Sequence, residues 1–105
     1  MVHRVETKRE VFSALREHSD ELRELGVKQL GLFGSFVRGE QTAASDVDLL
    51  VQFEPDKKNF DNFMHLSTLL EELLQRRVEI VTTEALSPYI GPHILREVEY
   101  AILSA

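Results

Sequence analysis

The chain contains no cysteine, so neither disulfide bonds nor thiolate metal ligands are available to it. It also has no apolar run that approaches the ~20 residues of a transmembrane helix. The N-terminal stretch, MVHRVETKRE, is rich in charge and lacks the apolar centre of a signal peptide. We therefore expect a cytoplasmic protein that does not enter a membrane.

Basic residues are scarce relative to acidic ones. Twelve Lys and Arg stand against 18 Asp and Glu, which gives a net charge of -6 over 105 residues. Nucleic-acid binding needs clustered Lys and Arg for the phosphates, so no direct contact with nucleic acid is expected, and a basic protein partner suits the charge better. The length predicts a single domain over residues 1–105, with little room for a second, acceptor-binding domain.

Apolar periodicity predicts four helices and three strands. The expected helices cover residues 5–18, 19–25, 60–74 and 92–100, with Ser19 as the cap of the second, and the expected strands cover 27–33, 46–53 and 78–82. A helical turn over 35–39 and a polar loop over 40–45 separate the first two strands. This order predicts an α/β (α+β) fold, in which a small mixed sheet has helices packed on it.

The second predicted strand carries two acids on one face. Side chains alternate between the faces of a strand, so Asp46 and Asp48 point the same way, roughly 7 Å apart. The opposite face is wholly apolar and consists of Val47, Leu49, Val51 and Phe53. Two neighbouring carboxylates repel each other, and a divalent cation such as Mg²⁺ would relieve the repulsion. The alternative is that Asp46 caps the loop and Asp48 faces solvent.

Gly34 and Ser35 mark the point where the first strand ends and a helical turn begins. Backbone N–H groups at such a junction can bind an anion, and glycine lets a phosphate come close. The alternative is an ordinary turn with a serine cap. Ten residues separate this pair from Asp46-x-Asp48, and a chain of this length would show the combined pattern by chance about once in a thousand.

The segment GLFGSFVRGEQTAASDVDLLV resembles the nucleotidyltransferase superfamily of DNA polymerase beta, whose signature is Gly-Ser, a spacer and Asp-x-Asp. The chain is most similar to the minimal nucleotidyltransferases, which are short prokaryotic proteins. The resemblance implies the polymerase beta-like nucleotidyltransferase fold. It also implies ATP as substrate, with Gly34 and Ser35 binding its β- and γ-phosphates. Arg38 adds a positive charge to the phosphates or holds the loop, unless it is simply a solvated residue.

The resemblance further implies three catalytic carboxylates that bind two Mg²⁺ ions. Asp46 and Asp48 match the two acids that bridge both ions in this superfamily. Glu79 matches the third position, which is usually Asp, and would bind the ion that activates the acceptor hydroxyl. A solvent-facing residue of an edge strand is the alternative for Glu79.

Members of the minimal group often act as the antitoxin of a HEPN-type RNase toxin encoded beside them. The resemblance implies transfer of AMP from ATP to a tyrosine of that toxin. Two other functions stay open: a non-catalytic antitoxin that blocks its partner sterically, and a transferase that acts on a small molecule. Assembly with further copies of itself or with the toxin is equally open.

Overall fold

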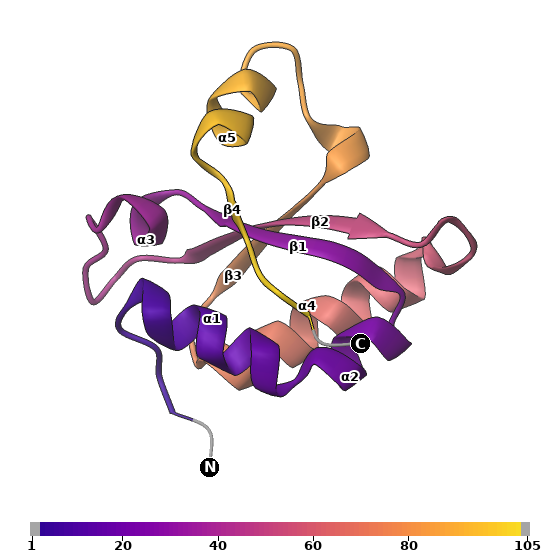
Figure 1. The fold of residues 1–105 in the computed structure, drawn as a ribbon, viewed down its shortest axis with the longest axis horizontal. Coiled ribbons are helices and arrows are strands. Elements are labelled where there is room, and N and C mark those ends of the chain that lie inside the picture. Colours follow the sequence, from indigo (N-terminus) through magenta and orange to yellow (C-terminus); the bar gives the residue numbers. More distant parts are fainter. Residues whose placement is uncertain (1–2, 104–105) are drawn as a thin grey trace.

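A computed structural model describes residues 3–103 and contains a four-stranded mixed sheet with helices on both faces (Figure 1). The helices are α1 (Lys8–Glu17), α2 (Ser19–Glu24), α3 (Ser35–Arg38), α4 (Phe60–Leu74) and α5 (Gly91–Glu97). The strands are β1 (Val27–Phe33), β2 (Val47–Phe53), β3 (Val78–Thr82) and β4 (Glu99–Tyr100), and short 3-10 turns occur at η1 (Pro55–Lys57) and η2 (Thr83–Ala85). The predicted small mixed sheet is confirmed.

The strand order is β3-β2-β1-β4. Strands β2 and β3 run parallel, whereas β1 is antiparallel to both β2 and β4. Helices α1, α2 and α4 lie on one side of the strands, and α5 lies on the other (Figure 1). None of the helices in the described part of the chain combines the length and apolarity that a bilayer crossing requires.

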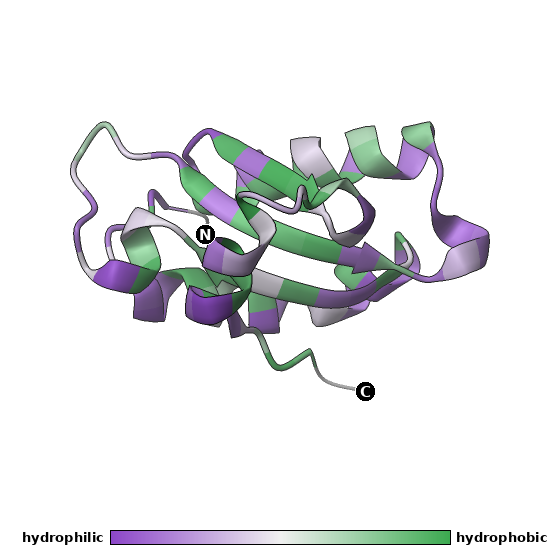
Figure 2. Ribbon diagram, turned by 90° about the horizontal axis from the view of Figure 1, so that it is seen from above, coloured by the Kyte–Doolittle hydropathy of each residue, from purple (hydrophilic) through white to green (hydrophobic). Residues whose placement is uncertain are grey.

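The core lies between the sheet and the layer of α1, α2 and α4. Hydrophobic residues predominate in the strands, with single hydrophilic residues between them (Figure 2). The predicted apolar face of β2 is buried in this core, and its members are Val47, Leu49, Val51 and Phe53. Val11 and Leu15 of α1, and Leu66 and Leu70 of α4, are fully buried against them. Alternation along β2 therefore directs Asp48 to the opposite face.

The first helix begins later than predicted, at Lys8 instead of residue 5. Thr7 Oγ1 accepts the Glu10 N–H at 3.1 Å, and the Glu10 carboxylate accepts the Thr7 N–H at 3.2 Å. This reciprocal capping box fixes the helix start. Ser19 does not cap α2 as predicted, because it is already the first helical residue and its hydroxyl donates to the Arg16 carbonyl at 2.7 Å.

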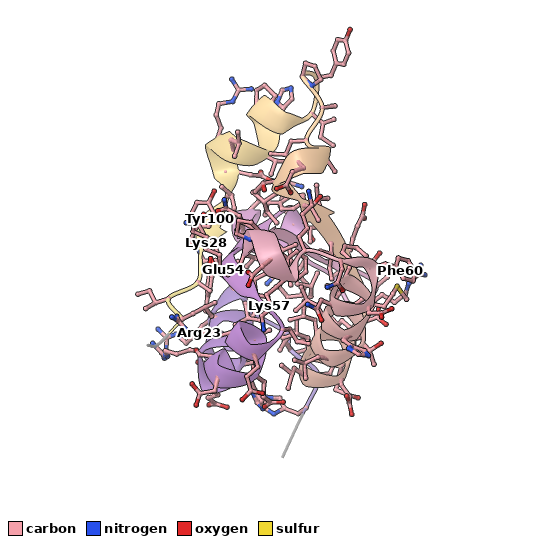
Figure 3. The ribbon with its side chains drawn as sticks, turned by 90° about the vertical axis from the view of Figure 1, so that its right-hand side faces the viewer. Arg23, Lys28, Glu54, Lys57, Phe60 and Tyr100 are labelled. Atoms are coloured by element: carbon pink, nitrogen blue, oxygen red, sulfur yellow. The ribbon has the colours of Figure 1, made fainter. Side chains whose placement is uncertain are left out.

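The predicted helix over 92–100 is wrong at its C-terminal end. Helix α5 stops at Glu97, and Glu99–Tyr100 form β4 against β1. Gly31 permits this pairing, since a Cβ there would lie 2.5 Å from Cγ2 of Val98. Figure 3 shows Tyr100 of β4 and Phe60 of α4 on opposite sides of the molecule. The chain after α5 thus returns to the sheet beside β1.

A buried arginine ties the polar loop before β2 to the end of α4. Arg76 is 6% exposed, its Nε donates to the Val5 carbonyl at 2.7 Å, and its Cζ lies 5.0 Å from the centroid of the Phe36 ring. Its Nη1 donates to the carbonyl oxygens of Thr42, Ala43 and Ser45, at 3.2, 3.3 and 2.8 Å. One guanidinium therefore holds the segment that leads directly into Asp46.

We expect Arg76→Met to lower the free energy of unfolding by about 2–4 kcal/mol, because several carbonyl groups lose their charged donor. Urea denaturation measures the loss. The control is Arg77→Met, which removes a neighbouring exposed cation and should change stability by no more than about 0.5 kcal/mol. Equal losses in the two variants would show that Arg76 does not organise the loop.

Candidate active site

Gly34 stands where β1 ends and α3 begins, and only glycine fits there. Its φ of 81° and ψ of -153° lie in a region that side chains disfavour. A Cβ on Gly34 would also lie 2.1 Å from Oδ2 of Asp48 and 3.0 Å from its Cγ. The Gly34 backbone and the Asp48 carboxylate therefore lie directly against each other, although the two belong to different parts of the chain.

Asp48 lies at the centre of a cluster of three acids, with Asp46 and Glu79. It pairs with Phe33 across β1 and β2, and with Glu79 across β2 and β3. Asp46 lies one residue before β2, so the predicted strand start at 46 is one residue early. Asp46 and Asp48 are half-buried and Glu79 is exposed. The three acids predicted from the sequence thus lie near one another at one end of β2.

The electrostatics of the cluster favour a cation. The pKa of Asp48 is raised from 3.8 to about 6, chiefly by burial and further by the charges of Glu79 and Asp46, while Arg38 opposes the rise. An acid whose ionised form is penalised in this way gains from any positive charge that approaches it. Negative charge is therefore in excess around Asp48.

A magnesium ion fits the donors of this cluster. Across residues 3–103, no group of three or more His, Cys, Asp and Glu side chains converges as a complete metal site. Mg²⁺ does not need such a group, since it commonly binds one or two carboxylates and takes its other oxygens from water and substrate phosphates. Asp46 and Asp48 can supply the carboxylates, and the Gly34 backbone lies against the carboxylate of Asp48.

Glu97, at the C-terminal end of α5, belongs to the site and was not predicted. Its Oε2 accepts the Gly34 N–H at 2.7 Å, and its Oε1 accepts Nη1 of Arg38 at 2.9 Å. Arg38 also donates from Nε to Glu40 at 2.8 Å. Burial favours a raised pKa for Glu97, but the Gly34 N–H and Arg38 outweigh it and hold that pKa below its ordinary value. The ionised Glu97 carboxylate therefore occupies the turn at Gly34, where the sequence predicts that a phosphate binds.

The remaining two predicted residues come from the same short helix. Ser35 is the half-buried first residue of α3, directly after Gly34. Arg38 is the last residue of α3 and is exposed, but its charge reaches both Asp48 and Glu97. All six predicted residues therefore gather around the contact between Gly34 and Asp48. A hydrogen-bond donor for anions and an excess of carboxylates for cations meet at this point.

Comparisons of the sequence and of the fold both find nucleotidyltransferases. The model of the nucleotidyltransferase domain family matches residues 15–102, a range that contains all of the candidate site residues. The protein adenylyltransferase MntA of Thermococcus cleftensis is 45% identical over 95 residues, which cover 90% of this chain and 95% of that protein. The solved structure of a candidate minimal nucleotidyltransferase has 34% identity and a TM-score of 0.69, over 84% of this chain and 93% of that one.

Two more distant structures share the fold. One is a toxin–antitoxin complex with AMP-PNP, with 19% identity and a TM-score of 0.66, over 91% of this chain and 73% of that one. The other is a tri-AMPylated HEPN toxin of Shewanella oneidensis in complex with an MNT antitoxin, with 16% identity and a TM-score of 0.55, over 84% of this chain and 71% of that one.

The raised pKa of Asp48 predicts that Asp48→Asn stabilises the folded protein, by an amount that depends on pH. Between the ordinary pKa of 3.8 and the folded value of about 6, the folded chain keeps a proton that the unfolded chain releases. Ionisable Asp48 therefore costs stability as the pH rises, and the full cost is present above the folded pKa. In EDTA, the variant should melt above the parent at about pH 8 and together with it at about pH 4.

Thermal unfolding followed by circular dichroism measures both melting temperatures. Asp56→Asn, at an exposed position of η1, is the matched control and should track the parent at both pH values. A gain for Asp48→Asn that is the same at both pH values would contradict the electrostatic origin of the effect.

Proposed function

Because the chain belongs to the nucleotidyltransferase domain family, and within it to the minimal nucleotidyltransferases, we propose that it transfers AMP from ATP to a partner protein. The acceptor is a tyrosine hydroxyl of a HEPN-type toxin, and the protein acts as the antitoxin. The observation that carries the proposal is the contact of the Gly34 backbone with the Asp48 carboxylate. It brings the donors for a triphosphate against the acids for its metal ions.

The similar proteins support the protein acceptor. The Thermococcus relative is named a protein adenylyltransferase, and it is matched over nearly its whole length. The two distant complexes, one with AMP-PNP and one with an AMPylated HEPN toxin, share the fold of this chain. The net charge of -6 suits a basic partner such as an RNA-cleaving enzyme, because opposite charges steer association.

The residues of the site divide the proposed reaction between phosphate binding and metal binding. The Gly34 N–H and the Ser35 hydroxyl bind the β- and γ-phosphates, and Arg38 adds positive charge. These contacts hold the α-phosphorus in line with the acceptor oxygen, and such alignment removes much of the entropic barrier. The acceptor oxygen then forms its bond to the α-phosphorus while the bond to the β-phosphate oxygen breaks, so that pyrophosphate leaves.

The acids would hold the metal ions, and Glu79 would also accept a proton. Asp46 and Asp48 would bind two Mg²⁺ ions, and Glu79 would bind the one nearer the acceptor. Bound Mg²⁺ supplies Lewis-acid stabilisation of the attacking and leaving oxygens. Glu79 is exposed beside Asp48, so it can reach an acceptor that arrives from solvent and take the proton of its hydroxyl. Its longer side chain, compared with the usual Asp, extends this reach.

One observation favours a non-catalytic antitoxin as the second candidate. Glu97 already holds the Gly34 N–H and Arg38, the two groups that the triphosphate would use. A chain that kept this contact permanently would bind its toxin without modifying it. Inhibition of the toxin without any change in its mass distinguishes this function from transfer.

Intact-mass spectrometry of the cognate toxin tests the proposed reaction. After incubation with the parent protein, ATP and Mg²⁺, we expect the toxin to gain the mass of one or more AMP groups. The double variant Asp46→Asn/Asp48→Asn should add none, because it cannot hold the metal ions, yet it should remain folded because neither side chain belongs to the core. If the toxin is neutralised while its mass stays unchanged, the protein inhibits it sterically and does not transfer AMP to it.

Ser35→Ala tests the phosphate-binding turn. Loss of one hydrogen bond to a charged group costs about 1.5–3 kcal/mol, so the rate of AMP transfer should fall about ten- to a hundredfold. Single-turnover transfer from labelled ATP measures the rate. Ser13→Ala, which makes the same change on α1 outside the candidate site, should leave it unaltered. Equal rates for the two variants would show that the Ser35 hydroxyl does not bind the triphosphate.

A further inference from the structure

Glu97 makes a specific contact with the turn that precedes α3. Its side chain is 25% exposed and spans two donors, the Gly34 N–H at 2.7 Å and Nη1 of Arg38 at 2.9 and 3.2 Å from its two oxygens. Charge-assisted bonds of this kind are roughly twice as strong as neutral ones. The contact joins residues 63 positions apart in the chain, so it is a feature of the tertiary structure.

A carboxylate in this position has the chemistry of a phosphate oxygen. Both are anions that accept from backbone N–H groups and from guanidinium. Building on the proposed function, we propose that Glu97 competes with the nucleotide triphosphate for Gly34 and Arg38 and is displaced when the nucleotide binds. Glu97 thereby sets the affinity of the site for nucleotide, and its displacement couples nucleotide binding to α5.

The two anions cannot share the Gly34 N–H. The Gly34 N–H carries one hydrogen, and Glu97 already accepts it at a short distance. A triphosphate beside a retained Glu97 would also face that charge in addition to Asp48, which lies against Gly34. Displacement of the carboxylate removes both conflicts and frees Arg38 for the phosphates.

Helix α5 can move without opening the core. The buried core cluster of the described residues draws its members from other elements, although Ile94 of α5 is itself buried. Figure 1 shows α5 on the side of the strands opposite α1, α2 and α4. Release of Glu97 therefore frees the C-terminal end of α5 from α3, while β4 stays paired with β1 and the core cluster stays closed.

Isothermal titration calorimetry with Mg²⁺ and α,β-methylene-ATP, which cannot donate AMP, tests the competition. In Glu97→Gln the side chain keeps its size and an oxygen for the Gly34 N–H, but it loses the charge that pairs with Arg38. We expect its dissociation constant to be about tenfold lower than that of the parent, the equivalent of one charge-assisted hydrogen bond.

Glu99→Gln is the matched control. It removes the same charge two residues further on, where Glu99 is exposed and pairs with Lys8 at 3.1 Å. Its affinity should match that of the parent within about twofold, because exposed ion pairs contribute little. If Glu97→Gln binds no more tightly than Glu99→Gln while the parent binds normally, Glu97 is no competitor and the proposed function is untouched. Absence of binding in all three proteins overturns the proposed function and the competition with it.

Nuclear magnetic resonance of the parent protein gives a second test that does not depend on any variant. The Glu97 side-chain carboxyl carbon and the Gly34 amide should both shift when the protein is saturated with Mg²⁺ and the analogue, because their hydrogen bond breaks. A shift of the Gly34 amide together with an unchanged Glu97 carboxyl would show that the carboxylate stays in place, and this would overturn the proposal.

Discussion

The site depends on the close approach of the Gly34 backbone to the Asp48 carboxylate. A Cβ on residue 34 would lie 2.1 Å from Oδ2 of Asp48, so any side chain would push the end of β1 away from β2. The contact brings the two halves of the Gly-Ser and Asp-x-Asp pattern together across the intervening loop. An N–H donor that attracts anions then lies beside acids that attract cations. A metal–triphosphate complex carries both charges and matches this arrangement.

Other parts of the fold hold the contact in place and offset the free-energy penalty of an ionised Asp48. Arg76 fixes the loop before Asp46 through bonds to its carbonyl groups. The parallel pairing of β2 with β3 places Glu79 beside Asp48. Burial and the neighbouring acids disfavour ionisation of Asp48, and the apolar face on the other side of β2 stabilises the strand against that penalty. The site and the core are thus opposite faces of a single strand.

Local patterns predicted the parts of the site that depend on local structure. The alternation over residues 47–53 gave the direction of Asp48, and the Gly34-Ser35 pair gave the strand end. Glu79 came from the family resemblance. Glu97 escaped prediction because its position depends on β4, which has two residues and shows no alternation, and on the close packing that Gly31 permits. Thr7 and Glu10 form a capping box that marks the start of α1, but the helix predicted from apolar periodicity began at Val5, which is buried in a segment without regular secondary structure.

A crystal structure with Mn²⁺ and α,β-methylene-ATP tests the assignment of the site most directly, because anomalous scattering locates the metal. We expect an anomalous peak bound by Asp46 and Asp48. We also expect phosphate oxygens within hydrogen-bonding distance of the Gly34 N–H and the Ser35 hydroxyl, with the Glu97 carboxylate moved away from both. A nucleotide bound elsewhere, or a metal peak away from the two aspartates, would contradict the assignment of this site.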